Sequence, residues 1–146
     1  MSVLVLPTHI RQQIEQEGIA AYPDECCGIL LGIEEPGAQM TRRVVDRIIP
    51  VTNAFDEAEQ YHRFSIDPKS LMQAEREAGR TGKLVLGFYH SHPDEPARPS
   101  EYDRTHAWEF YSYVIVSIKE GKPADLTAWM LTAPGGGFRS QDIYRH

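Results

Sequence analysis

The feature that most constrains the fold is an apolar run that ends in two histidines. Residues 84–89, Leu-Val-Leu-Gly-Phe-Tyr, predict a buried strand, and His90-Ser91-His92 follow it directly. Because successive side chains of a strand point to opposite faces, we expect His90 and His92 to share one face, about 7 Å apart along the chain. Two imidazoles in that arrangement suit the binding of one small cation, whereas Ser91 points to the other face.

A loop rich in proline separates the histidines from a predicted helix start. Pro93, Pro96 and Pro99 precede Ser100, and Asp103 falls on the first turn of the helix. If the loop folds back, Asp103 joins the histidines, and two imidazoles with one carboxylate form a usual three-ligand catalytic zinc site. A second interpretation stays open: the histidines are polar residues at a loop mouth, and Ser100 and Asp103 form a capping box.

These residues resemble the JAMM signature of the MPN-domain metallopeptidases. The signature pairs His-Ser-His-Pro, here residues 90–93, with Ser-x-x-Asp six residues later, here residues 100–103. The family also has a glutamate far upstream, in a segment of the form Pro-x-Glu-x-Cys-Gly-x-Leu-x-Gly. Residues 23–32 match that segment position by position, with Glu25 as the glutamate.

The resemblance implies a zinc-dependent metallopeptidase that hydrolyses an amide or isopeptide bond. It implies that His90, His92 and Asp103 hold Zn²⁺, whose bound water has a pKa of about 7. It also implies that Glu25 is the general base and that Ser100 donates a hydrogen bond to the oxyanion. Taken alone, Glu25 would be a solvated carboxylate at the mouth of a strand, and Ser100 would be a helix N-cap; one hydroxyl can serve both roles.

Between the two motifs the resemblance continues and indicates a substrate. Asn53 and residues 63–68 are similar to small prokaryotic members, so the resemblance covers residues 23–118. Such members imply that the partner is a ubiquitin-like or sulfur-carrier protein with an extended tail of the Gly-Gly type. The tail could lie along a sheet edge, with residues 53–60 and 94–99 as the walls of its groove. The bond that is cut, the physiological metal and the oligomeric state stay open.

Several other side chains near the motifs have competing interpretations. His106 lies one helical turn after the predicted carboxylate ligand and could face the metal, although a surface histidine is commoner. Cys27 shares strand parity with the predicted base and could block the zinc as a thiolate, although a buried packing thiol is commoner. Cys26 has no assigned role. Trp108 and Phe110 are interpreted as core and sheet residues.

Length and composition limit the remaining possibilities. At 146 residues, the chain is expected to form one domain, residues 1–146. The formal net charge of −6 argues against binding nucleic acid or a membrane surface through the overall field. No apolar run approaches the ~20 residues that cross a bilayer, and the N-terminus lacks the pattern of a secretory signal. The two cysteines are adjacent and poorly placed for a structural disulfide, so we expect a cytoplasmic location.

The elements predicted along the chain indicate an α/β fold with a mixed sheet. Because several strands adjoin through turns, the arrangement is α+β-like. The resemblance implies a curved, mostly antiparallel sheet flanked by helices, an MPN fold related in layout to cytidine deaminases. The tail from residue 138 is expected to add an edge strand or to be irregular. Expected strands cover residues 3–6, 26–34, 41–51, 61–66, 83–89, 113–118 and 126–131, and expected helices cover residues 8–21, 68–79 and 100–109.

Two other functions fit parts of the pattern. A non-catalytic MPN scaffold that only binds partners would share the fold but lack metal ligands, whereas every ligand position is filled here. A zinc nucleobase deaminase would share the layout but requires a Pro-Cys-x-x-Cys pair and a His-x-Glu motif. Cys26 and Cys27 lack that spacing, and the His-Ser-His segment lacks the glutamate.

Overall fold

One mixed sheet of eight strands forms the frame of the computed structural model, which describes residues 2–61 and 63–146. The order across the sheet is β7-β6-β5-β4-β2-β3-β1-β8. The β2–β3, β2–β4, β5–β6 and β6–β7 pairs are antiparallel, and the β4–β5, β1–β3 and β1–β8 pairs are parallel. The strands are β1 (Ser2–Val5), β2 (Cys27–Glu35), β3 (Thr41–Val51), β4 (Leu84–Pro93), β5 (Ser112–Lys119), β6 (Lys122–Leu131), β7 (Phe138–Gln141) and β8 (Ile143–Tyr144).

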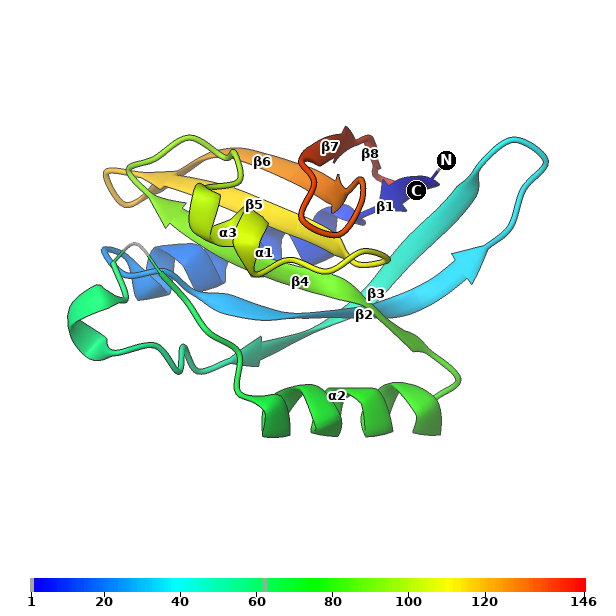
Figure 1. Ribbon diagram of the computed structural model, residues 1–146, viewed down its shortest axis with the longest axis horizontal. Helices are drawn as coiled ribbons and strands as arrows, with labels where there is room; N and C mark the ends of the chain where they lie inside the picture. Colours follow the sequence, from blue (N-terminus) through cyan, green and yellow to red (C-terminus); the bar gives the residue numbers. More distant parts are fainter. Residues whose placement is uncertain (1, 62) are drawn as a thin grey trace.

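The sheet curves until its two edges almost meet. Strands β7 and β8 stand at opposite ends of the strand order, yet Asp142 is the one residue between them. The backbone N–H of Leu4 in β1 donates to the carbonyl of Asp142 at 2.9 Å, and that of Leu6 donates to the carbonyl of Tyr144 at 2.7 Å. Figure 1 shows the red C-terminal strands beside the blue N-terminal strand. This nearly barrel-shaped sheet confirms the predicted curved, mixed architecture.

Helices α1 (Thr8–Ala21) and α2 (Pro68–Arg80) cover opposite faces of the sheet. Leu30 of β2 belongs to the core cluster of α1, which includes Ile10 and Ile14. Its neighbours Ile29 and Leu31 belong to the cluster of α2. Because side chains alternate along a strand, the continuous apolar run of β2 is buried on both sides, as Figure 1 allows the reader to follow. This places β2 and its neighbour β4 at the centre of the molecule.

The start of α2 is as the sequence predicted, whereas α3 (Glu101–Thr105) is shorter than expected. The Asp67 side chain accepts a hydrogen bond from the N–H of Lys69 and caps α2. The helix expected over 100–109 ends at Thr105. Phe110 has a φ of +80°, which a right-handed helix does not permit, and the N–H of Trp108 donates to the Tyr113 hydroxyl at 2.8 Å.

The strand expected over residues 61–66 is not formed by residues 63–66; residue 62 lies outside the described residues. The polar groups of this backbone pair with a side chain instead of a neighbouring strand. Asn53 donates to the carbonyl of Arg63 at 2.9 Å and accepts from the N–H of Ser65 at 3.0 Å. A short 3₁₀ helix, η1 (Glu57–Glu59), lies within the preceding loop.

Candidate metal centre

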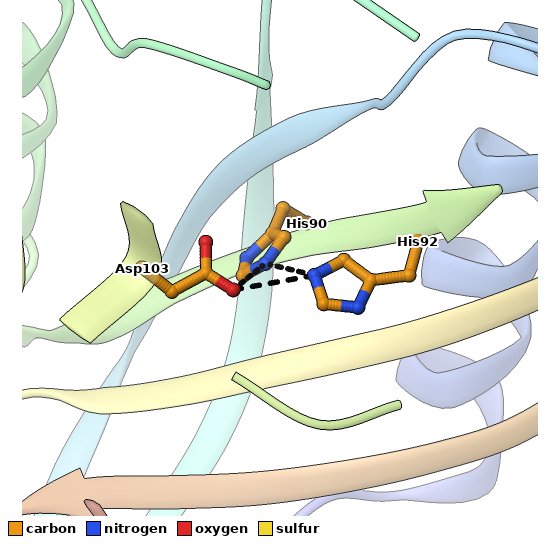
Figure 2. Close-up of side chains that lie close together, drawn as sticks. All are labelled: His90, His92 and Asp103. Atoms are coloured by element: carbon orange, nitrogen blue, oxygen red, sulfur yellow. Dashed lines mark hydrogen bonds and ion pairs between the residues drawn. The ribbon is translucent and has the colours of Figure 1, made fainter. Parts of the chain in front are cut away.

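Three side chains from two separate segments converge at the end of β4. His90 and His92 lie on the same face of the strand, and their Nε2 atoms are 3.1 Å apart. Asp103, on the first turn of α3, places Oδ2 3.3 Å from Nε2 of His90 and 3.2 Å from Nε2 of His92. Figure 2 shows the two rings and the carboxylate pointing toward one another. The loop after Pro93 therefore folds back as the sequence predicted.

The geometry of this His90–His92–Asp103 cluster fits a small divalent cation. Tetrahedral zinc with bonds of 2.0–2.1 Å has neighbouring ligand atoms about 3.3 Å apart. The three ligand atoms here are 3.1–3.3 Å apart. Within residues 2–61 and 63–146, this is the one group of three or more such side chains found close enough to share an ion. Two imidazole nitrogens and one carboxylate oxygen are donors typical of zinc and similar metals.

The loop between the histidines and α3 sets the orientation of His92. Nδ1 of His92 lies 2.9 Å from the carbonyl oxygen of Pro96, so Nδ1–H donates there and the lone pair of Nε2 faces the cluster. Two hydroxyls hold the loop in place: Ser117 donates to the carbonyl of Glu95, and Thr127 donates to the carbonyl of Ala97, both at 2.6 Å. The position of the Pro96 carbonyl is therefore determined by β5 and β6.

His90 is held by packing. Its ring is stacked on Phe64, with centroids 4.3 Å apart and planes inclined by 23°. Nδ1 of His90 is buried without a hydrogen-bond partner among the described residues. Burial lowers the pKa of His90, which favours the neutral form that binds metals. Burial acts in the same direction on His92, but Asp103 and the Pro96 carbonyl outweigh it and raise the pKa of His92.

Ser100 and Asp103 form the capping box that their spacing predicted. The N–H of Asp103 donates to Oγ of Ser100 at 3.0 Å, and the N–H of Ser100 donates to Oδ2 of Asp103 at 2.8 Å. Burial alone would raise the pKa of Asp103, but the two histidines and the N–H of Ser100 outweigh it and hold this pKa below its ordinary range. In the cap, Ser100 uses an oxygen lone pair, which leaves its O–H proton free to donate elsewhere.

Glu25 lies beside His92 because of the antiparallel register of β2 and β4. Cys27 pairs with His90, and the N–H of Ser91 donates to the carbonyl of Cys26, so the next pair in register is Glu25 with His92. Opposed residues of an antiparallel pair project to the same face. Glu25 is only 6% exposed, so it is not a solvated carboxylate. Burial, opposed by His92 and reinforced by Asp103, raises its pKa to about 8.

Comparison with known proteins identifies the family. The family model described as "Prokaryotic homologs of the JAB domain" matches residues 7–132. The chain belongs to this family. This JAB-domain protein is 35% identical over 104 residues to the desampylase of Haloferax volcanii, covering 70% of this chain and 69% of that one. It is 31% identical over 113 residues to a probable TtuB-protein conjugate cleaving protease of Thermus thermophilus, covering 77% and 69% of the two chains.

Solved structures show the same fold around the JAB domain. The solution structure of a Salinibacter ruber protein is 36% identical, has a TM-score of 0.72 and covers 99% of this chain and 91% of its own. A JAB1/MPN domain protein of Archaeoglobus fulgidus is 19% identical, has a TM-score of 0.57 and covers 97% of both chains. The predicted family and fold are therefore confirmed. Among the described residues, no helix is long and apolar enough to cross a membrane.

The remaining candidates of the JAB-domain protein lie outside the cluster. Cys27 is buried, its thiol donates to the carbonyl of Val51 at 3.6 Å, and burial raises its pKa to about 12, so it is a packing thiol. Cys26 is also a free, buried thiol. His106 is exposed at the end of α3, with Nδ1 2.8 Å from the carbonyl of Tyr102. The commoner interpretation of Cys27 and of His106 is therefore the one observed.

Sequence patterns missed two parts of this site. Asn53 bonds Phe55, Arg63 and Ser65, and its amide also donates to the carbonyl of Glu25 at 3.3 Å. A polar residue directly after a strand was the one available signal. The second part is a cavity of about 220 Å³ next to the cluster, which Trp108 helps to line. The assignment of Trp108 and Phe110 to the core was wrong, since they are 61% and 49% exposed.

Proposed function

We propose that this JAB-domain protein is a zinc-dependent metallopeptidase. Its substrate would be an amide or isopeptide bond at the C-terminal tail of a ubiquitin-like or sulfur-carrier protein, the tail being of the Gly-Gly type. The observation that carries the proposal is the convergence of three ligand atoms beside a buried carboxylate, Glu25. The names of the two curated relatives, a desampylase and a conjugate cleaving protease, support the same class of reaction.

In this proposal His90, His92 and Asp103 hold Zn²⁺ and Glu25 moves the proton. Zinc, when bound, polarises the scissile carbonyl and acidifies a water molecule. Glu25 takes the proton of the attacking water and passes it to the leaving amine. Burial raises the pKa of Glu25 to about 8, so the side chain can hold a proton near neutral pH between the two transfers.

Ser100 is proposed to stabilise the oxyanion while it still caps α3. Its oxygen accepts from the N–H of Asp103, and its own proton can be donated to the developing negative charge. Loss of one such donor typically costs about 3 kcal/mol of transition-state stabilisation. The cap and the oxyanion contact use different parts of the same hydroxyl, so the two interpretations of Ser100 are compatible.

The walls predicted at residues 53–60 and 94–99 remain part of this proposal. The cavity next to the cluster takes only Pro99 from these two segments, and residues 64–66 form another part of it. The free thiols of Cys26 and Cys27 support a reducing compartment, and we place the enzyme in the cytoplasm.

The test compares the wild-type protein with Glu25→Gln, and with Glu75→Gln as a matched control on the exposed face of α2. Each protein is loaded with zinc and incubated with ubiquitin-like proteins that carry C-terminal extensions, and the products are weighed by mass spectrometry. We expect Glu25→Gln to retain one zinc ion and to lose turnover by at least about 100-fold. The Glu75→Gln control should match the wild type.

Two outcomes would contradict the proposal in different ways. Turnover by Glu25→Gln within about tenfold of the wild type would remove Glu25 as the base. A zinc-loaded wild-type protein that cleaves none of the substrates, or that keeps its turnover after complete chelation, would support a scaffold or a metal-independent enzyme instead.

A further inference from the structure

The cavity of about 220 Å³ beside the cluster has a part that the proposed chemistry does not use. His90 and Asp103 line one end of it. Its floor follows β4 and β5, where His90 pairs with Ile115 and, two residues earlier, Phe88 pairs with Tyr113. Two residues of strand span about 7 Å, so the cavity extends at least that far from the metal ligands along the sheet.

The far part of the cavity is apolar. Phe88, Tyr113 and Phe138 contact one another there, with Phe88–Tyr113 centroids 5.8 Å apart and Tyr113–Phe138 centroids 5.7 Å apart. Leu71 of α2 lines it as well. The Tyr113 hydroxyl already accepts from the N–H of Trp108. No charged side chain lines this far part of the cavity among the described residues, so a group bound there must be apolar.

The position of Glu25 indicates which side of the substrate enters the cavity. Glu25 lies opposite His92, and neither residue lines the cavity. In the proposed function, on which this inference rests, Glu25 delivers a proton to the leaving amine. The leaving amine therefore lies on the His92 side, and the acyl side of the substrate extends past His90 into the cavity.

Chain length then selects the residue of the tail that fills the cavity. Two C-terminal glycines have no side chains and cover about 7 Å when extended. The third and fourth residues from the scissile carbonyl are the first that can reach the wall formed by Phe88 and Tyr113. Because side chains of an extended segment alternate between faces, only one of these two can point into the cavity.

We propose that this cavity is a specificity pocket for an apolar side chain, carried by one of the two residues that precede the Gly-Gly pair. With about 30 Å³ for each water-sized group, 220 Å³ accommodates a side chain of four to seven heavy atoms, the range from leucine to phenylalanine. Leu71 and Phe138 are the specificity-determining residues. The tail is thus selected by the residue before the glycines as well as by the glycines.

The test uses synthetic eight-residue peptides that end in Gly-Gly joined to the ε-amine of a lysine. The two residues before the glycines are changed separately to Leu, Ala or Asp, and kcat/KM is measured with the zinc-loaded enzyme. We expect Leu→Ala to lower kcat/KM about 10- to 50-fold at one of the two positions, and Leu→Asp to lower it further. The other position should change it less than threefold.

Variants of the wall provide the second arm. Leu71→Ala should reduce the preference for Leu over Ala at least fivefold, whereas Met72→Ala, its exposed neighbour outside the cavity, should leave the preference unchanged. The third arm needs no metal: product peptides ending in Gly-Gly are titrated into ¹⁵N-labelled, metal-free protein. The Leu peptide should shift the amide signals of Leu71 and Phe138, and the Asp peptide should not.

The outcomes separate this inference from the proposed function. Equal cleavage of all peptides, or a preference that follows only the residue after the scissile bond, would overturn the pocket and leave the hydrolase intact. If no peptide is cleaved, the hydrolase proposal fails, and the titration decides the pocket by itself. Unchanged signals of Leu71 and Phe138 with the Leu peptide would then overturn it.

Discussion

Replacing Asn53 with alanine should loosen the segment that holds Glu25. The Asn53 amide makes four hydrogen bonds across the loop. It accepts from the N–H groups of Phe55 and Ser65, each at 3.0 Å, and donates to the carbonyls of Arg63 at 2.9 Å and Glu25 at 3.3 Å. The N–H of Glu25 also donates to the carbonyl of Gln60, at 2.7 Å, in the same loop. Asn53 thus joins the loop to the backbone of the proposed base.

The expected magnitude follows from these four bonds. At about 1 kcal/mol each, their loss would cost about 4 kcal/mol if every partner stayed unpaired. Asn53 is only half-buried, so water can reach some of the partners, and we expect a loss of about 2 kcal/mol in the free energy of unfolding. A domain stable by 5–15 kcal/mol remains folded after such a loss. A shift of about 1 Å in Glu25 would lower turnover by about 100-fold.

The assay combines urea unfolding of the metal-free protein with turnover of the zinc-loaded protein. Thr52→Ala, an exposed neighbour, is the control and should change the free energy of unfolding by less than 0.5 kcal/mol. If Asn53→Ala unfolds within 0.5 kcal/mol of the wild type and keeps full turnover, Asn53 does not position Glu25. Lower stability with full turnover would limit Asn53 to a role in the loop.

Three further results are expected. Thr127→Val removes the hydroxyl that holds the loop behind His92, and zinc affinity measured by chelator competition should fall at least about tenfold; unchanged affinity would rule out this positioning role. Burial raises the pKa of Glu25 from 4.5 to about 8, so between these pH values the folded metal-free protein binds more protons than the unfolded chain, and its free energy of unfolding should fall as pH rises; a slope that persists in Glu25→Gln would contradict this. Arg43, 2% exposed and bonded to Ser112, Glu34 and the carbonyl of Leu86, should cost about 3 kcal/mol of stability when changed to Met, whereas exposed Arg42→Met should cost under 0.5 kcal/mol, both by urea unfolding.

The parts of the site that sequence could predict are those governed by short-range rules. Alternation along β4 placed His90 and His92 on one face, and the spacing of Ser100 and Asp103 predicted the capping box. The convergence of Asp103 with the histidines was predicted as one of two open possibilities. The upstream glutamate was found through the family resemblance, because nothing in the local pattern around Glu25 distinguishes it from a surface carboxylate.

The predictions that failed depended on contacts between distant segments. The helix expected over residues 100–109 ends at Thr105, since Trp108 pairs with Tyr113 of the next strand. Residues 63–66 do not form a strand, since Asn53 satisfies their backbone groups from ten or more residues away. Neither partner can be recognised from local propensity, because the competing hydrogen bond comes from another part of the chain.

The sequence by itself determined the family, the central strands, the starts of the helices and the identity of the three candidate ligands. These depend on residue type, side-chain alternation and helix capping, all of which act over a few residues. Only the tertiary structure decided that Glu25 is buried opposite His92, that the Pro96 carbonyl orients that histidine, and that an apolar cavity adjoins the cluster. Burial and register join segments that lie about 65 residues apart, and both arise only when the sheet has closed around them.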